Sequence, residues 1–73
     1  MTADDLQKTR QEIGDYLRAE RRKRGISKYK ICKDADFPNL RPIDNIESGR
    51  GYTVDTLLRY LDATKISLHL RDD

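Results

Sequence analysis

Two stretches of helical periodicity, each closed by a glycine, constrain the fold of this 73-residue chain more than any other feature. The first covers about residues 4–24 and stops at Gly25, and the second covers about residues 40–48 and stops at Gly49. Glycine commonly follows the last residue of a helix because it adopts the left-handed conformation without strain. The residues between the two stretches leave room for one further short helix and a turn. Gly14 weakens the first stretch, which forms either one helix or two.

Capping residues and apolar spacing predict the other helices. Ser27 is a good N-cap for a helix over about residues 28–35, and a turn at residues 36–39 separates it from the next helix, which Asn39 can cap. Thr53 can cap a fourth helix. The apolar residues of that helix recur at i, i+3, i+4 and i+7, and they are Val54, Leu57, Leu58 and Leu61. The sequence therefore predicts a mainly α domain of four to five helices.

The end of the chain follows a different period. Between residues 65 and 71 apolar and polar side chains alternate, which indicates a short β-strand. No other segment alternates well enough to pair with it inside one chain. Because an unpaired strand leaves backbone groups unsatisfied, we expect it to pair with the same strand of a second subunit. The apolar residues of this dimerisation strand are Ile66, Leu68 and Leu70.

Length and composition exclude several classes of protein. Residues 1–73 make a single domain, and a chain this short buries only about 60% of its unfolded surface, which favours added stability from a homodimer. No apolar run is long enough to span a membrane, and the N-terminus lacks the features of a signal peptide. The single cysteine and the absence of a Cys/His cluster give no disulfide and no metal site. We therefore expect a cytoplasmic protein without a cofactor or a membrane partner.

Catalysis is not expected either. The sequence contains no nucleophile–base pair and no glycine-rich phosphate loop, and so small a domain offers little pocket volume. We expect no catalytic residues.

The positive charge is concentrated in one segment. The net charge of the chain is only +2, but residues 21–33 contain seven basic side chains and no acidic one. A charge run of this kind is often a solvated surface. Here it overlaps the first of the two helices that would form a helix-turn-helix, and a basic patch beside that motif is typical of contact with a polyanion. The interpretation that follows is binding to double-stranded DNA.

Three motifs carry a resemblance to a known family. They are Leu17-x-x-x-Arg21-x-x-x-Gly25-Ile26-Ser27, Ile46-Glu47-Ser48-Gly49 and Thr56-Leu57-Leu58. Together they resemble the lambda repressor/Cro-type helix-turn-helix proteins, the XRE family, over about residues 13–63. The C-terminal strand resembles that of HipB-type antitoxins.

Three features depart from the family pattern. Asp36 replaces the usual glycine of the turn, and Lys28 replaces the glutamine that often opens the second helix. The stretch from Ala35 to Gly49 is one residue longer than the commonest spacing.

In a helix-turn-helix, the second helix of the pair enters the major groove with its N-terminal residues at the base edges. Arg41 has the fork that fits guanine, Asn45 can pair with adenine, and Leu40 can meet a thymine methyl group. The predicted base-contacting residues are Asn39, Leu40, Arg41, Asp44 and Asn45. The predicted phosphate-contacting residues are Lys28, Lys30, Arg50 and Tyr52.

The resemblance also implies a structural ion pair between Arg21 and Glu47, which would hold the reading helix against the rest of the domain. The function it implies is a sequence-specific transcriptional regulator that binds an inverted repeat as a homodimer. Such a regulator could be a repressor or an autoregulating antitoxin with a cognate toxin as partner. The alternative is a protein-interaction adaptor of the same fold, because the carboxylates of Asp36, Asp44 and Glu47 would repel DNA if they were unpaired.

Overall fold

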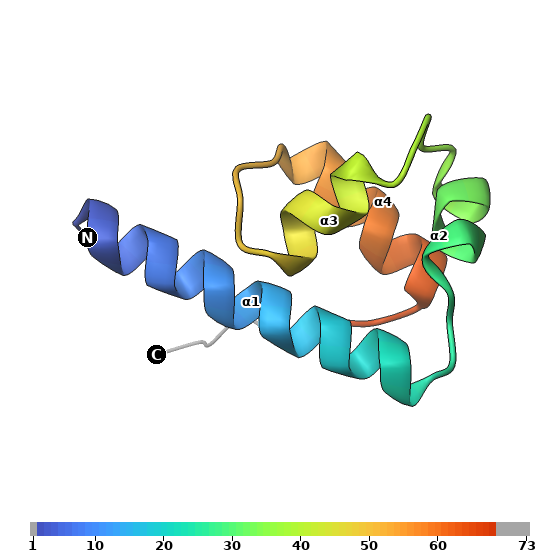
Figure 1. The fold of residues 1–73 in the computed structure, drawn as a ribbon, viewed down its shortest axis with the longest axis horizontal. Helices are drawn as coiled ribbons and strands as arrows, with labels where there is room; N and C mark the ends of the chain where they lie inside the picture. The colour runs from blue at the N-terminus through green and yellow to red at the C-terminus, as the bar shows by residue number, and fades with distance from the viewer. Residues whose placement is uncertain (1, 69–73) are drawn as a thin grey trace.

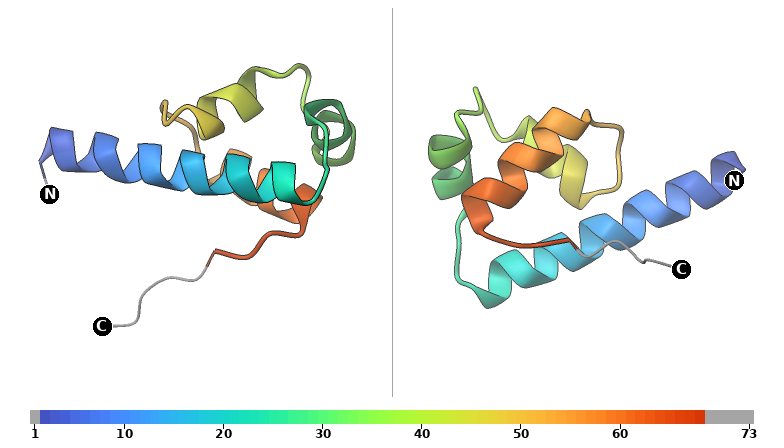
Figure 2. Two further views of the ribbon diagram at one scale, coloured as in Figure 1. Left: turned by 60° about the horizontal axis from the view of Figure 1, so that its bottom comes forward. Right: turned by 180° about the vertical axis from the view of Figure 1, so that it is seen from behind.

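Four helices make up the part of the chain that the structure, a computed structural model, describes, which is residues 2–68 (Figure 1). They are α1 (Ala3–Lys23), α2 (Lys28–Ala35), α3 (Arg41–Glu47) and α4 (Val54–Thr64). The N-terminal end of α1 extends past the other helices (Figure 1). α3 lies on the face seen in Figure 1 and packs on α1, whereas α4 lies on the face seen from behind and packs on α2 (Figure 2). Residues 2–68 thus form a compact all-α domain.

Side-chain caps begin three of the four helices, and those at Ser27 and Thr53 were predicted. The side-chain oxygens of Thr2, Ser27 and Thr53 accept hydrogen bonds from backbone N–H groups in the first turns of α1, α2 and α4. α3 begins differently, because Leu40 is at its cap position and has helical backbone angles. The Oδ1 atom of Asn39 still accepts a hydrogen bond from the N–H group of Arg41 at 2.9 Å. Asn39 therefore satisfies the helix start from one position further away than we predicted.

Left-handed residues end the helices. Gly25 and Gly49 have φ angles of 68° and 78°, as expected for glycines that follow a helix. Asp36, which stands where the resemblance led us to expect a glycine, has φ 59° and ends α2. Aspartate tolerates the left-handed region better than most side chains, so the turn between α2 and α3 keeps its geometry without a glycine.

α1 is a single helix that passes through Gly14, which settles the alternative left open by the sequence. A Cβ atom at position 14 would lie 2.5 Å from the carbonyl oxygen of Ile46 and 2.8 Å from that of Glu47. Both neighbours are backbone atoms of α3, so they cannot rotate away. The missing side chain lets α1 approach α3 this closely.

Gly14→Ala tests this close contact. Alanine favours a helix by about 1 kcal/mol over glycine, but the added methyl group must displace α3. We expect a net loss of about 1–3 kcal/mol in the free energy of unfolding, measured by urea denaturation. Gly51→Ala is the matched control, because no atom lies within 4 Å of its Cβ position. A Gly14→Ala protein as stable as the parent would contradict the argument.

The core collects apolar side chains from all four helices and the segment after α4. Its residues are Leu17, Ile31, Ala35, Ile43, Ile46, Tyr60 and Ile66. The helix predicted after Thr53 is confirmed as α4, but two residues of its apolar stripe face solvent, since Val54 is 69% exposed and Leu58 is 55% exposed. The buried face of α4 is rotated toward Tyr60 and Thr64, with Leu57 and Leu61 half-buried.

The segment after α4 forms no strand within the described residues. Ile66 is only 4% exposed and packs in the core of its own domain, and its N–H group donates to the carbonyl oxygen of Leu61. Ile66 therefore packs within its own chain, which corrects its predicted role in a dimerisation strand. Leu68 also lies against its own chain, on α1, but it is only half-buried. Leu70 lies outside the described residues.

None of the helices between residues 2 and 68 is long and apolar enough to cross a membrane.

Candidate nucleic-acid interface

A shallow hollow of about 330 Å³ opens between the first turn of α3 and the start of α4. Four residues that the sequence predicted as DNA contacts line it together: Asn39, Arg41, Asn45 and Tyr52. Thr53 and Thr56 complete the polar part of the lining. The sequence predicted Thr53 only as a helix cap, and it indicated Thr56 only as part of a motif of the resemblance. The structure thus gathers side chains from the turn, α3 and the following loop into one surface.

Arg41 and Asn45 lie one turn apart on α3, so their side chains share a face of this helix. Arg41 is exposed and forms no ion pair with any described residue. Asn39 uses the oxygen of its side-chain amide to cap α3, which leaves the nitrogen of that amide as a donor. These three side chains offer hydrogen-bond groups of the kinds that read base edges.

Two of the residues predicted to contact bases have other partners in the structure. Leu40 is half-buried and packs against the core, so it anchors the start of α3 and is not free to meet a base. Asp44 is exposed, and its Oδ1 atom accepts a hydrogen bond from the Nζ atom of Lys28 at 2.7 Å. The sequence predicted separate roles for Asp44 and Lys28, but the structure makes them partners across the turn.

Other basic side chains are also paired. Lys30 lies 3.1 Å from Asp34 on the same helix, and Arg24 lies 3.2 Å from Glu20. Both pairs are exposed, so each contributes little to stability and can exchange for a phosphate. Arg50 forms no ion pair with any described residue, and its N–H group donates to the carbonyl oxygen of Asn45. Because Arg24, Lys28 and Lys30 are paired with carboxylates, the basic segment at residues 21–33 is less strongly positive than its sequence indicates.

A buried polar cluster lies behind α3. The Nε and Nη2 atoms of Arg21 donate to the two carboxylate oxygens of Glu47 at 2.7 and 3.1 Å, and Nη1 donates to the carbonyl oxygen of Ile26. The ion pair that the resemblance implied is therefore present and bidentate. The hydroxyl group of Tyr60 donates to Glu47 at 2.6 Å. The cluster joins α1, α3 and α4.

Tyr60 is the member of this cluster that the sequence did not reveal. Its side chain is fully buried. Burial and the hydrogen bond to Glu47 raise the pKa of Tyr60, and the hydrogen bond to Glu47 raises the pKa of Arg21. Tyr60 is therefore a neutral donor and Arg21 a cation, so both can satisfy the carboxylate of Glu47.

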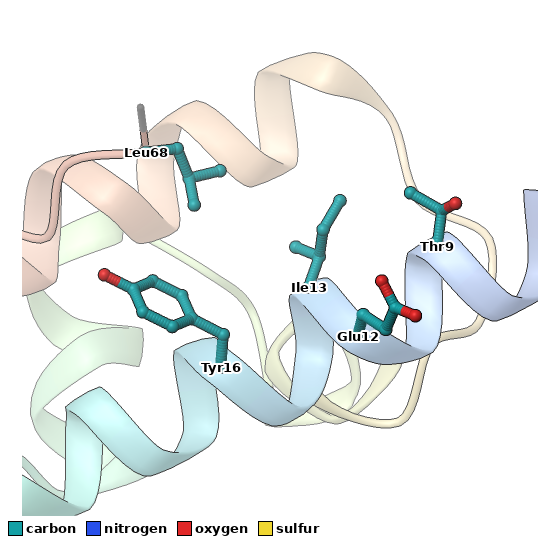
Figure 3. Close-up of a pocket in the computed structure, with 5 residues that line it drawn as sticks. All are labelled: Thr9, Glu12, Ile13, Tyr16 and Leu68. Atoms are coloured by element: carbon teal, nitrogen blue, oxygen red, sulfur yellow. The ribbon is translucent and has the colours of Figure 1, made fainter. Parts of the chain in front are cut away.

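A second hollow, of about 340 Å³, lies between α1 and the segment that follows α4 (Figure 3). Thr9, Glu12, Ile13 and Tyr16 line one side, and Leu68 lines the other. Its walls are mostly apolar, and the polar atoms of Thr9 and Glu12 do not converge on one point (Figure 3). Nothing in this arrangement fixes the orientation of a small ligand.

Cys32 is the one cysteine of the chain, and it lies beside the turn between α2 and α3. Its Sγ atom donates to the carbonyl oxygen of Asn39 at 3.1 Å, and burial raises the pKa of its thiol group. A thiol with a raised pKa is a poor nucleophile at neutral pH. Cys32 therefore supports the turn between α2 and α3.

No protein-family model, curated protein or solved structure matches this chain.

Proposed function

We propose that this domain is a sequence-specific DNA-binding transcriptional regulator, in which α2 and α3 form a helix-turn-helix. The observation that carries the proposal is the meeting of Asn39, Arg41 and Asn45 in one exposed hollow at the leading end of α3. Arg21 and Glu47 hold the other end of α3 against the rest of the domain. A helix fixed at one end and polar at the other suits insertion into the major groove.

Arg41 is the residue with the clearest role in this proposal. Its guanidinium group contacts the O6 and N7 atoms of a guanine, while Asn45, one turn further on, contacts the N6 and N7 atoms of an adenine. Lys28, Lys30, Arg50 and Tyr52 contact phosphates, which fix the register of the helix on the duplex.

Arg41→Ala tests the proposal. Duplexes bound by the parent protein are first selected from a random pool, and the affinities for the selected duplex and for random DNA are then compared. Because one bidentate contact contributes about 1–3 kcal/mol of discrimination, we expect the ratio of the two affinities to fall about 5- to 150-fold. Arg59→Ala is the control, since Arg59 is also exposed and without an ion pair among the described residues, but lies on α4. Equal losses on both duplexes would contradict the base-reading role.

The adaptor remains the alternative, and the environment of the carboxylates weighs against it. Asp44 is paired with Lys28, and Glu47 is buried in its ion pair with Arg21. Of the three carboxylates that favoured an adaptor, only Asp36 stays exposed without an ion-pair partner among the described residues. Repulsion of DNA phosphates near α3 is therefore weaker than the sequence alone indicates.

Homodimerisation and the choice between repressor and antitoxin belong to the same proposal. A two-fold dimer binds an inverted repeat because the symmetry of the protein matches that of the site. The burial of Ile66 within its own domain weakens the antitoxin interpretation, which depended on the C-terminal strand. Co-purification of a toxin from the native host would restore it.

A further inference from the structure

The loop between α3 and α4 is held by the N-terminal half of α1. The Nε2 atom of Gln7 donates to the carbonyl oxygen of Gly49 at 3.1 Å, and the Nη2 atom of Arg10 donates to the Oε1 atom of Gln7 at 2.9 Å. A Cβ atom at position 49 would lie 2.9 Å from the Cα atom of Gln11. This close packing and the two hydrogen bonds fix where the loop begins. The same loop carries Arg50 and Tyr52.

One nitrogen atom of the Arg10 side chain has no hydrogen-bond partner among the described residues. This atom, Nε, is buried, although the side chain as a whole is only half-buried. Because this atom is covered by protein, a bound anion must be contacted by the terminal nitrogen atoms of the guanidinium group. Neither Arg10 nor Arg50 forms an ion pair with a described carboxylate.

Arg10 also acts on Tyr52. The hydrogen bonds through Gln7 hold the guanidinium group of Arg10 at the start of the loop that carries Tyr52. Burial raises the pKa of the Tyr52 hydroxyl group, and the positive charge of Arg10 opposes this effect. The hydroxyl group therefore keeps its proton at neutral pH and can donate a hydrogen bond. Tyr52 lines the same hollow as Arg41 and Asn45.

We propose that Arg10, Arg50 and Tyr52 form an anion site that binds one phosphate of the DNA backbone. The inference rests on the proposed function and adds α1 to the interface. Arg10 supplies charge and N–H donors, Tyr52 supplies a hydroxyl donor, and Arg50 supplies the second charge. Gln7 is a positioning residue, because it connects Arg10 to the backbone of the loop. A phosphate bound here would set the register of Arg41 and Asn45 on the bases.

The salt dependence of binding distinguishes a phosphate contact from structural support. Each cation that neutralises a phosphate contributes about 0.9 to the slope of log affinity against log salt concentration. Affinity for the duplex selected by the parent protein is measured in KCl from low to moderate concentration. Because Arg10 and Arg50 share one phosphate, we expect Arg10→Met to lower the slope by at most about 0.9 for each bound subunit, and Arg10→Lys to restore it. Gln7→Met should weaken binding several-fold and leave the slope unchanged.

Lys8→Met is the matched control. Lys8 is an exposed cation on α1 with no ion pair among the described residues, and the proposal gives it no phosphate. Its replacement should leave the slope unchanged. Circular dichroism establishes that each variant is folded, and Arg10→Gln, with the same expected loss of slope, tests the site if Arg10→Met does not fold.

The outcomes separate the two levels of the proposal. If the parent protein binds no duplex, the proposed function fails. If the parent binds DNA but folded Arg10→Met keeps the parental slope, or if Lys8→Met lowers the slope equally, the anion site is wrong while the DNA-binding function stands.

Discussion

Replacement of Glu47 by alanine is expected to lower the free energy of unfolding by about 3–5 kcal/mol, because it leaves a buried cation without its partner. Arg21 loses two hydrogen bonds at 2.7 and 3.1 Å, and Tyr60 loses one at 2.6 Å. Small domains have a total stability of only about 5–15 kcal/mol. The replacement should therefore remove a substantial fraction of the total stability. Urea denaturation monitored by circular dichroism measures the change.

Companion variants identify the cause of this loss. Glu12→Ala removes an exposed carboxylate without an ion pair among the described residues and should change stability by less than about 0.5 kcal/mol. Tyr60→Phe removes one hydrogen bond to a charged group, at a cost of about 1.5–3 kcal/mol. A double replacement, Arg21→Met with Glu47→Leu, should recover stability relative to Glu47→Ala, because apolar residues remove the unpaired charge. A Glu47→Ala protein with parental stability would show that the cluster does not hold α3.

The cluster also connects stability with the proposed reading of DNA. Glu47 lies at the C-terminal end of α3, whereas Arg41 and Asn45 present their side chains toward its leading end. Loss of Glu47 should therefore weaken binding to cognate and random DNA alike, in proportion to the fraction unfolded. Loss of Arg41 should act mainly on the preference between the two. The two variants separate support of the helix from recognition by it.

The features that the sequence predicted well are local ones. Ser27 and Thr53 cap their helices because a side-chain oxygen reaches an N–H group only two or three residues away. Gly25 and Gly49 take positive φ angles for a reason that depends on the backbone alone. The ion pair of Arg21 and Glu47 joins residues 26 positions apart, and it was expected only through the family resemblance.

The features that the sequence did not predict depend on how the helices pack. Apolar spacing defined a stripe on α4, but the contact with α2 and α3 buries Tyr60 and leaves Leu58 at the edge. The contact between Lys28 and Asp44 arises from the angle of the turn between two helices. The polar connection from Arg10 through Gln7 to Gly49 likewise depends on where α1 passes the loop. Periodicity describes one element at a time, so it contains none of these relations.

Binding to DNA is expected to weaken steeply with salt, since phosphate contacts release condensed cations. A dimer that makes about six to ten such contacts should lose roughly 10³–10⁵-fold in affinity between 50 and 200 mM salt, measured by fluorescence anisotropy on the selected duplex. The ion pair of Lys28 and Asp44 gives this prediction a control within the chain. Asp44→Asn frees the ammonium group of Lys28 for a phosphate, so it should strengthen binding to random DNA and steepen its salt dependence. Lys28→Met should do the opposite, because it removes the cation and leaves the carboxylate of Asp44 facing the duplex. An affinity independent of salt would mean that phosphates are not the partner of this surface, and the adaptor would then be the better interpretation of the fold.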